Sequence, residues 1–428
     1  MAPVVIYCPY SSPRLSYVLD WIFNEQLQAG YLLTTNKETA LISYGAATPN
    51  TISIPDAGLL QKTGIEEHEI STGTSNGTPA IYLNAQKGYT FNFDLFSAIF
   101  FLISRYEEYL PFTPDKHNRY PATKSILFKM DSLERPLVDE WLSSLRSELN
   151  KHISIPTPVF SFLPTYDIDI AYSYTYKGFI PTVGGYLKDL MAGKMQQVRE
   201  RNAVLNGAQD PFDSFDWLFD LHGKYRKRPV YFILSALKRT AFDKNIHPKH
   251  PAMKQLIKKL AANGDIGLHP SYYSNRDTDL IFSEKKVLVS VANVPVNISR
   301  QHYIKNKIPY TYKLLLAKTI TDDYSMGYAT HLGFRAGTSH SFPWYNLKNE
   351  EQTTLRIHPF CFMDTAARFE CGLSAGEAFT RLDKMKKLLQ TNGGSLVTVF
   401  HNFSLGTDAG WEGWKEGYED FFRKAAIS

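Results

Sequence analysis

Apolar and polar positions change their period along the later part of this chain, and the change predicts its fold class. Short apolar runs of strand length recur from residue 159 onward, and segments with the apolar spacing of helices separate them. The predicted strands are residues 159–163, 229–234, 266–268, 294–298, 333–334, 355–357 and 396–400. Since strands that alternate with helices form parallel sheets, we expect an α/β arrangement of about seven strands, closed or partly closed into a barrel.

The earlier part of the chain has shorter strands between turn residues. Its predicted strands are residues 4–8, 40–44, 51–54 and 80–83, and its predicted helices are residues 15–27, 94–109 and 136–152. Asp94 is placed to cap the second of these helices. Residues 155–158, Ile-Pro-Thr-Pro, form a stiff extended segment because proline also restricts the residue before it. We therefore predict an N-terminal α/β domain over residues 1–155 and a barrel over residues 156–428, with a polar loop at residues 192–212.

Composition and charge narrow the class of protein. At 428 residues and 43% hydrophobic content, the chain is long enough for two or three domains with buried cores. The most apolar window, residues 96–103, is far shorter than a membrane span, and the first residues lack the features of a signal peptide. Cys8, Cys361 and Cys371 lack the spacing of a disulfide framework or a cysteine zinc site. With a net charge of +5 and no dominant basic block, we expect a cytoplasmic protein that neither spans a membrane nor binds nucleic acid.

The strongest chemical signal is Thr-Tyr-Asp-Ile-Asp, residues 165–169, directly after the first predicted barrel strand. Asp167 and Asp169 are two apart, and residues with this spacing point to the same side of a strand. Both carboxylates would then reach the C-terminal mouth of a barrel, where barrel enzymes build their sites. Carboxylates this close repel each other unless a cation lies between them or one takes part in proton transfer. The alternative is an Asp-rich strand end or a helix N-cap.

Polar clusters also follow the other predicted strands, in phase with them. Their candidate residues are His269, Arg300, His302, Arg335, His358 and His401. A single histidine after a strand is more often structural, but repeated clusters at strand ends lie together on one face of a barrel. One carboxylate and two imidazoles form a zinc-type donor set with an open position. A second carboxylate can act as general base on the bound water, and a further histidine can protonate the leaving group. The site composition therefore predicts metal-assisted hydrolysis.

Three motifs resemble those of polysaccharide deacetylases, the NodB-homology group of carbohydrate esterase family 4. They are Thr-Tyr-Asp-Ile-Asp at residues 165–169, His-Pro-Ser-Tyr-Tyr-Ser at residues 269–274 and Thr-Val-Phe-His-Asn at residues 398–402. The resemblance covers residues 159–428 and implies a distorted (β/α)7 barrel, a divalent metal, usually zinc, and removal of N- or O-acetyl groups from a carbohydrate. The two-part layout also resembles bacterial deacetylase-like proteins whose N-terminal domain has no assigned role.

The same resemblance implies a role for individual residues. Asp167 corresponds to the catalytic base, Asp169 and His269 correspond to metal ligands, and His401 corresponds to the catalytic acid. An arginine beside the base would hold that carboxylate in place. The two candidates for this arginine are Arg300, which follows a predicted strand in the expected order, and Arg335, which lies in the more motif-like Gly-Phe-Arg-Ala-Gly-Thr.

One position departs from the family's pattern and leaves the third metal ligand open. The family's second motif has two histidines four apart, but Tyr273 stands where the second would be. The replacement candidates are, in order, His302, His358 and His331. His302 is placed first because it lies at the next predicted strand end.

Aromatic residues beside the motifs are candidate substrate contacts, since aromatic faces suit sugar rings as well as ordinary packing. They are Tyr272, Tyr273 and Trp411. With them, the sequence predicts a metal-dependent deacetylase acting on a carbohydrate. Two alternatives remain: a degenerate barrel that binds a glycan without hydrolysing it, which the missing second histidine favours, and a hydrolase of a non-sugar amide.

Overall fold

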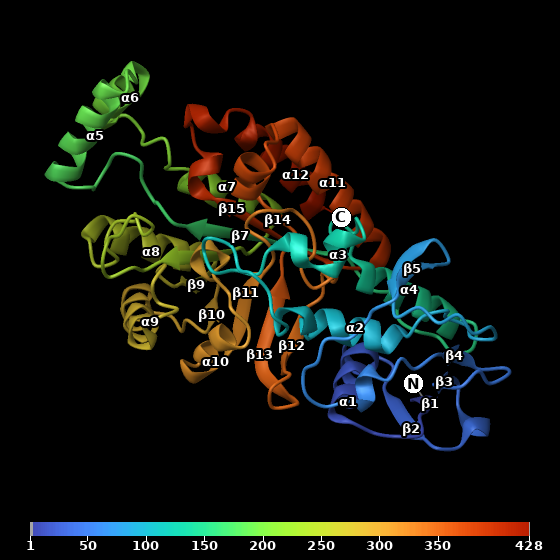
Figure 1. Cartoon of the computed structure of the whole chain (residues 1–428). Coiled ribbons are helices and arrows are strands. Elements are labelled where there is room, and N and C mark those ends of the chain that lie inside the picture. The colour runs from blue at the N-terminus through green and yellow to red at the C-terminus, as the bar shows by residue number, and fades with distance from the viewer. Residues whose placement is uncertain (1–2, 428) are drawn as a thin grey trace.

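A nine-stranded mixed sheet is the largest element of the computed structural model, which describes residues 3–427 (Figure 1). Its strands run in the order β12-β13-β11-β10-β9-β8-β7-β15-β14. They are β7 Ser161–Ile168, β8 Val230–Leu234, β9 Asp265–His269, β10 Ile298–Ser299, β11 Asp322–Met326, β12 Phe342–Asn346, β13 Glu351–Pro359, β14 Phe362–Met363 and β15 Ser395–His401. Within the described residues, each neighbouring pair is parallel except β12 with β13. The carboxyl ends of the parallel strands therefore share one edge.

The sheet is curled, and the evidence is that side chains from strands that are not neighbours meet at this edge. Asp169 follows β7 and His302 follows β10, three strand positions away. In a flat sheet that separation would be about 14 Å, at roughly 4.8 Å per strand. The His302 Nε2 and Asp169 Oδ2 atoms are instead 3.4 Å apart. Curling thus brings the ends of separate strands around one space.

Amphipathic helices follow most of these strands and share a core with them. They are α7 Phe215–Tyr225, α8 Pro251–Asn263, α9 Thr278–Ala292, α10 Tyr310–Ala317, α11 Ala375–Asn392 and α12 Trp414–Ala426. Helix α8 starts at Pro251, a residue suited to the first helical position, and its His250 side chain caps the Ala252 N–H. Its buried residues recur at helical spacing: Met253, Leu256, Ile257 and Leu260. This spacing fixes the face that the helix turns to the sheet.

The first part of the chain forms a smaller α/β unit with a parallel sheet in the order β2-β1-β3-β4 and a hairpin, β5-β6. Its strands are β1 Val4–Tyr7, β2 Tyr31–Thr34, β3 Ile42–Tyr44, β4 Ile52–Ile54, β5 Thr72–Ser75 and β6 Thr78–Ile81. Its helices are α1 Pro13–Leu19, α2 Leu95–Ile103, α3 Ile126–Lys129 and α4 Leu137–Leu149. As predicted, Asp94 caps α2, by accepting a hydrogen bond from the Ser97 N–H. Every residue of α2 is buried, so this helix lies inside the unit's core.

One hydrophobic core continues from this unit into the large sheet. From the later part of the chain it includes Ile308, Tyr312, Phe342, Trp344 and Leu355. Hydrogen bonds cross the same boundary: Tyr17 Oη donates to the Pro343 carbonyl at 2.7 Å, and Trp21 Nε1 donates to the Ser341 carbonyl at 3.0 Å. The β12–β13 hairpin therefore packs on the first unit as well as on its own sheet.

The predicted strand at residues 333–334 is wrong. The backbone of Gly333 has φ 121°, and a Cβ there would lie 2.2 Å from the Leu133 carbonyl oxygen. Glycine is needed because two backbones cross at this point, and the apolar pair is part of a loop between β11 and β12. The next strand, β12, runs antiparallel to β13, so the sheet is mixed and not purely parallel.

Two further expectations about elements need correction. The predicted strand at residues 294–298 shrinks to β10, which begins only at Ile298. The predicted loop at residues 192–212 contains α6, Met195–Leu205, which with α5, Phe179–Met191, extends away from the rest of the chain (Figure 1). No helix that the structure describes is long and apolar enough to cross a membrane.

Candidate metal centre

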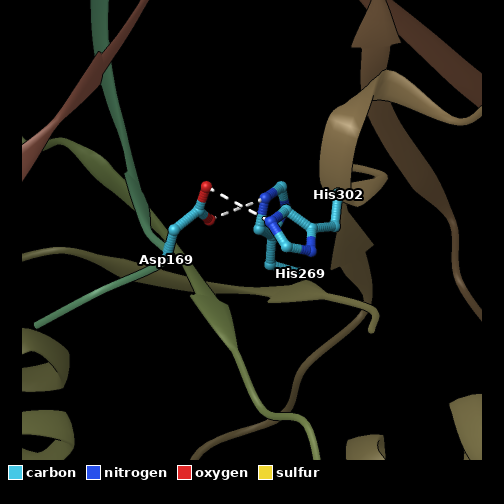
Figure 2. A group of neighbouring side chains, drawn as sticks. All are labelled: Asp169, His269 and His302. Atoms are coloured by element: carbon cyan, nitrogen blue, oxygen red, sulfur yellow. Dashed lines mark ion pairs between the residues drawn. The ribbon is translucent and has the colours of Figure 1, made fainter. Parts of the chain in front are cut away.

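Three side chains from separate strand ends converge at the carboxyl edge of the large sheet. Asp169 directly follows β7, His269 is the last residue of β9, and His302 starts a turn after β10. One donor atom from each lies within 4.8 Å of the other two. His269 Nε2 is 3.0 Å from Asp169 Oδ1, and His302 Nε2 is 3.4 Å from Asp169 Oδ2. Figure 2 shows both imidazole rings facing this carboxylate.

The outer nitrogens of both imidazoles are held by acceptors. His269 Nδ1 lies 2.5 Å from the Arg300 carbonyl oxygen, and His302 Nδ1 lies 3.1 Å from Asp243 Oδ1. A carbonyl or carboxylate oxygen only accepts, so each Nδ1 carries a hydrogen. In the neutral rings the Nε2 lone pairs then point toward Asp169. Such outer partners orient metal-binding histidines in proteins.

This arrangement fits a divalent cation. Asp169 Oδ1 is buried and receives no hydrogen bond from the residues that the structure describes. The Nε2 lone pairs of His269 and His302 face the carboxylate of Asp169 at these distances. A positive charge between these three groups stabilises the arrangement. Two imidazoles and one carboxylate also form the donor set of borderline metals such as zinc, and they leave coordination positions open.

Without a cation, protons would have to supply the missing positive charge. Burial raises the pKa of Asp169, but the neighbouring His302 and His269 outweigh it and hold the pKa well below its usual range. Burial lowers the pKa of His302, but Asp169 and Asp243 outweigh it and raise the pKa to about 9. The carboxylate therefore stays charged, and positive charge is favoured beside it.

Asp167 lies beside this group and is held by Arg300. Arg300 Nη1 donates to Asp167 Oδ1 at 2.7 Å, while its Nε donates to the Tyr324 carbonyl at 3.0 Å. The guanidinium carbon also lies 4.2 Å from the centre of the Phe232 ring. The second oxygen, Asp167 Oδ2, is 3.8 Å from His269 Nε2. Arg300 thus holds one oxygen of Asp167 and leaves the other turned toward His269.

His401, the last residue of β15, approaches the centre from the other side of β7. Its Nδ1 lies 2.7 Å from Asp364 Oδ1, and its backbone N–H donates to Asp364 Oδ2 at 2.7 Å. Its Nε2 lies 3.5 Å from Asp169 Oδ2. Burial lowers the pKa of His401, but Asp364 and then Asp169 outweigh it and raise the pKa well above its usual range. A proton on Nε2 is therefore favoured in the cation-free site.

These side chains open into a cavity of about 420 Å³. Its lining includes Asp167, Asp169, His269, His302 and His401. The aromatic side chains that join them are Phe242, Tyr303, Phe369 and Phe403. The N-terminal unit contributes His117 and Arg119, and Arg119 Nη1 donates to the Tyr303 carbonyl at 2.8 Å. Both parts of the chain therefore build this cavity.

The other arginine and histidine candidates lie elsewhere. Arg335 forms a buried pair with Glu108 at 2.5 Å and makes no contact with Asp167 among the described interactions. His358 pairs with Asp322 at 2.7 Å, and His331 contacts Thr330 at 3.0 Å. Neither histidine joins the three-residue group.

The aromatic candidates do not line this cavity among the residues that the structure describes. Tyr273 is 41% exposed, so it points to solvent. Trp411 is buried and packs against Phe403, with ring centres 5.8 Å apart. Tyr272 faces a neighbouring cavity. None of the three therefore lines the cavity with Asp167, and a contact of any of them with a substrate stays a prediction.

Two orienting carboxylates, Asp243 and Asp364, were not identified as site residues from the sequence. Asp364 directly follows the two-residue strand β14, so an acid after a short apolar stretch is the signal that could have found it. Asp243 accepts from both the His302 ring and the Tyr272 N–H, at 3.1 and 2.8 Å. It lies in a polar loop without any pattern that marks it.

Comparisons with known proteins match parts of the chain. Residues 4–154 match a family of unknown function, DUF7033. A search of curated proteins finds no match.

Among solved structures, a polysaccharide deacetylase candidate from Mycobacterium smegmatis superposes with a TM-score of 0.40 and 16% identity, covering 64% of this chain and 86% of the other. An allantoinase gives a TM-score of 0.41 and 11% identity, covering 63% and 85%. A carbohydrate esterase family 4 pseudoenzyme from Bacillus anthracis gives 0.32 and 7%, covering 63% and 61%. All three superpositions are loose, so the chemistry of the cavity has to be argued from its own side chains.

Proposed function

We propose that this chain is a metal-dependent hydrolase that removes acetyl groups, as amide or ester, from a carbohydrate. The observation that carries the proposal is the convergence of Asp169, His269 and His302 beside two further oriented pairs, Asp167–Arg300 and His401–Asp364. A set of metal ligands, a carboxylate that can accept a proton and a histidine that can donate one are the minimum for metal-assisted attack of water on a carbonyl. The motif resemblance of residues 159–428 supports the acetyl and carbohydrate parts of the proposal.

In this proposal each side chain has one task. Asp169, His269 and His302 would hold the cation, which when bound supplies Lewis-acid polarisation of a carbonyl oxygen and makes water more acidic. Asp167 accepts the proton that water loses as its oxygen bonds to the acetyl carbon, and Arg300 keeps that carboxylate aimed. The Nε2–H of His401 donates a proton to the nitrogen or oxygen that leaves. Acetate and a free amine or hydroxyl are the products.

Finer features belong to the same proposal. We take zinc as the resident cation, since two imidazoles and a carboxylate suit it. We take the curled sheet as a distorted (β/α)7-type barrel that carries the catalytic residues over residues 156–428, with residues 1–155 as a domain that supplies part of the cavity wall. The observation that supports this role of the first domain is the lining contributed by His117 and Arg119.

The alternative of a binding barrel without catalysis depended on Tyr273 replacing a second histidine. His302 lies within 3.4 Å of Asp169 from another strand end, so the donor set is complete without that position. This completeness favours the hydrolase over the binding module. Hydrolysis of a non-sugar amide would use the same side chains, so only an assay of different substrates distinguishes it from deacetylation of a carbohydrate.

The test is the replacement of the proposed base, Asp167→Asn. We expect acetate release from acetylated sugars to fall by about 10²–10⁴-fold, because the amide cannot accept the proton. Cation content and unfolding midpoint should stay close to those of the original chain. Asp420→Asn, at an exposed position on α12, is the matched control and should keep full activity. Undiminished activity of Asp167→Asn would show that Asp167 is not the base. If the original chain hydrolyses small amides but no acetylated sugar, its substrate is a non-sugar amide and not a carbohydrate.

A further inference from the structure

A second cavity of about 450 Å³ adjoins the metal centre, and the charged side chains that line it are all positive. Four cationic side chains line it: Lys116, Arg276, Lys305 and Lys307. No carboxylate is among its described lining residues. Two acids of neighbouring segments already have partners: Asp115 pairs with Arg119 at 2.7 Å, and Asp243 accepts from His302 and from the Tyr272 N–H. The cavity therefore concentrates positive charge without an internal counter-ion.

Lys305 is the buried member of this group. Its side chain is only slightly exposed, its Nζ donates to the Tyr272 carbonyl at 2.7 Å, and the same atom lies 3.6 Å from the centre of the Tyr272 ring. It forms no ion pair with the described residues. A buried ammonium group with no counter-ion is costly, and a bound anion would offset that cost.

One strained turn connects the two cavities. Tyr303 and Ile304, both non-glycine, have φ 58° and 52°. Left-handed backbone is unfavourable for such residues, and strain of this kind gathers at functional sites. The turn places His302 in the metal centre and Lys305 in the second cavity. The chain therefore accepts unfavourable backbone angles to present a metal-type donor and a buried cation on neighbouring surfaces.

His117 is the shared wall of the two cavities and ties them to the N-terminal unit. It lines both cavities, and its Nδ1 lies 2.9 Å from Tyr272 Oη. The two cavities therefore lie next to each other on either side of this residue. Lys116 reaches the second cavity from the same N-terminal segment.

We propose that the second cavity binds an oxyanion carried by the substrate, so that the enzyme acts on an acidic, acetylated carbohydrate. A phosphate ester and a sugar carboxylate share this chemistry, and both match a cluster of lysine and arginine side chains. The acetyl part of this substrate rests on the proposed function, whereas the oxyanion site stands on its own geometry. The site also gives the N-terminal unit a task, which is to supply part of the anion-binding surface.

The binding test uses the full chain, freed of cations, titrated with inorganic phosphate and separately with acetate by calorimetry. We expect one phosphate per chain, and at least tenfold weaker binding in Lys305→Met. If Lys305→Met does not fold, the double variant Lys116→Met/Lys307→Met, at two exposed positions, is used instead. It should also bind phosphate at least tenfold more weakly. Lys258→Met, an exposed lysine on α8, removes the same charge elsewhere and should bind normally. Tighter binding of acetate than of phosphate would assign the site to carboxylates.

A kinetic arm separates this proposal from the proposed function. The KM of an acetylated sugar phosphate should rise at least tenfold in Lys305→Met, while the KM of the uncharged acetylated sugar should not change. Phosphate binding that is absent, or equal in Lys305→Met and the original chain, overturns the anion site and leaves the hydrolase proposal intact. Phosphate binding without turnover of any acetylated sugar keeps the anion site and overturns the hydrolase.

Discussion

At the scale of residues, the sequence located the side chains that converge in the structure better than it located their partners. Asp167, Asp169, His269 and His401 were predicted because acids and histidines at the ends of parallel strands share one edge, and the structure brings these four together. The choice between Arg300 and Arg335 required the fold, since only the contact of Arg300 with Asp167, 133 positions away, separates them. The orienting carboxylates were missed for the same reason: no periodicity marks a partner that meets its histidine only in three dimensions.

The His401–Asp364 pair predicts a pH effect. Asp364 helps raise the pKa of His401, so removing its charge in Asp364→Asn should lower that pKa. The acid would then lose its proton at lower pH, and the alkaline limb of the kcat profile should move to lower pH. Measuring kcat against pH for both proteins checks this. An unchanged alkaline limb would mean that His401 is not the acid that the profile reports.

At the scale of elements, caps and helical spacing were predictable, while very short strands were not. Asp94 before α2 and the buried spacing of α8 follow from local sequence. Strand β10 has only two residues, too few to show a period, and its place is set by pairing with β9 and β11. Gly333 lies in an apolar pair that resembles a strand, but a backbone crossing decides its conformation.

Helix α9 carries a buried acid whose charge should weaken the fold at high pH. Burial raises the pKa of Glu284 to about 7, against a usual 4.5, and Oε2 accepts from the Ser271 N–H at 3.0 Å. The folded state thus holds this proton more tightly than the unfolded state. Stability contributed by the proton is present below pH 4.5 and is lost as pH rises through about 7.

Glu284→Gln replaces the titrating carboxyl group with a neutral amide, so it should raise the free energy of unfolding at high pH and leave it unchanged at low pH. We expect the variant to match the original chain at pH 5 and to be more stable at pH 8.5, by on the order of 1–3 kcal/mol. Urea unfolding at the two pH values measures the difference. A variant that is less stable at pH 8.5 would show that the glutamate is ionised and stabilised in the fold.

At the scale of the whole molecule, the two parts of the chain depend on each other. The shared core and the buried Glu108–Arg335 pair join the first unit to the loop between β11 and β12. Arg105 donates to Glu108 and to the Arg335 carbonyl, which completes the network. The sequence predicted the alternation of strands and helices but not β11, β12 or β14. The motif-like position of Arg335 suggested a catalytic role, whereas in the fold this residue pairs with Glu108 of the first unit.

Breaking this network should destabilise the entire chain. In Glu108→Gln, buried Arg335 loses its counter-charge, and we expect the free energy of unfolding to fall by about 3–5 kcal/mol. Glu66→Gln removes an exposed pair with Lys62 and should leave the unfolding midpoint unchanged. Urea denaturation of the three proteins makes the comparison. Equal midpoints for Glu108→Gln and the original chain would mean that the pair does not hold the parts together.

We propose above all that Asp169, His269 and His302 hold one divalent cation. Titration of the cation-free chain with Co²⁺, followed by its visible absorption and by bound metal per chain, tests it most directly. We expect one equivalent for the original chain, loss of binding in His302→Ala, and unchanged binding in His358→Ala, whose histidine pairs with Asp322 instead. Absence of stoichiometric binding, or equal binding by His302→Ala and the original chain, would contradict the account.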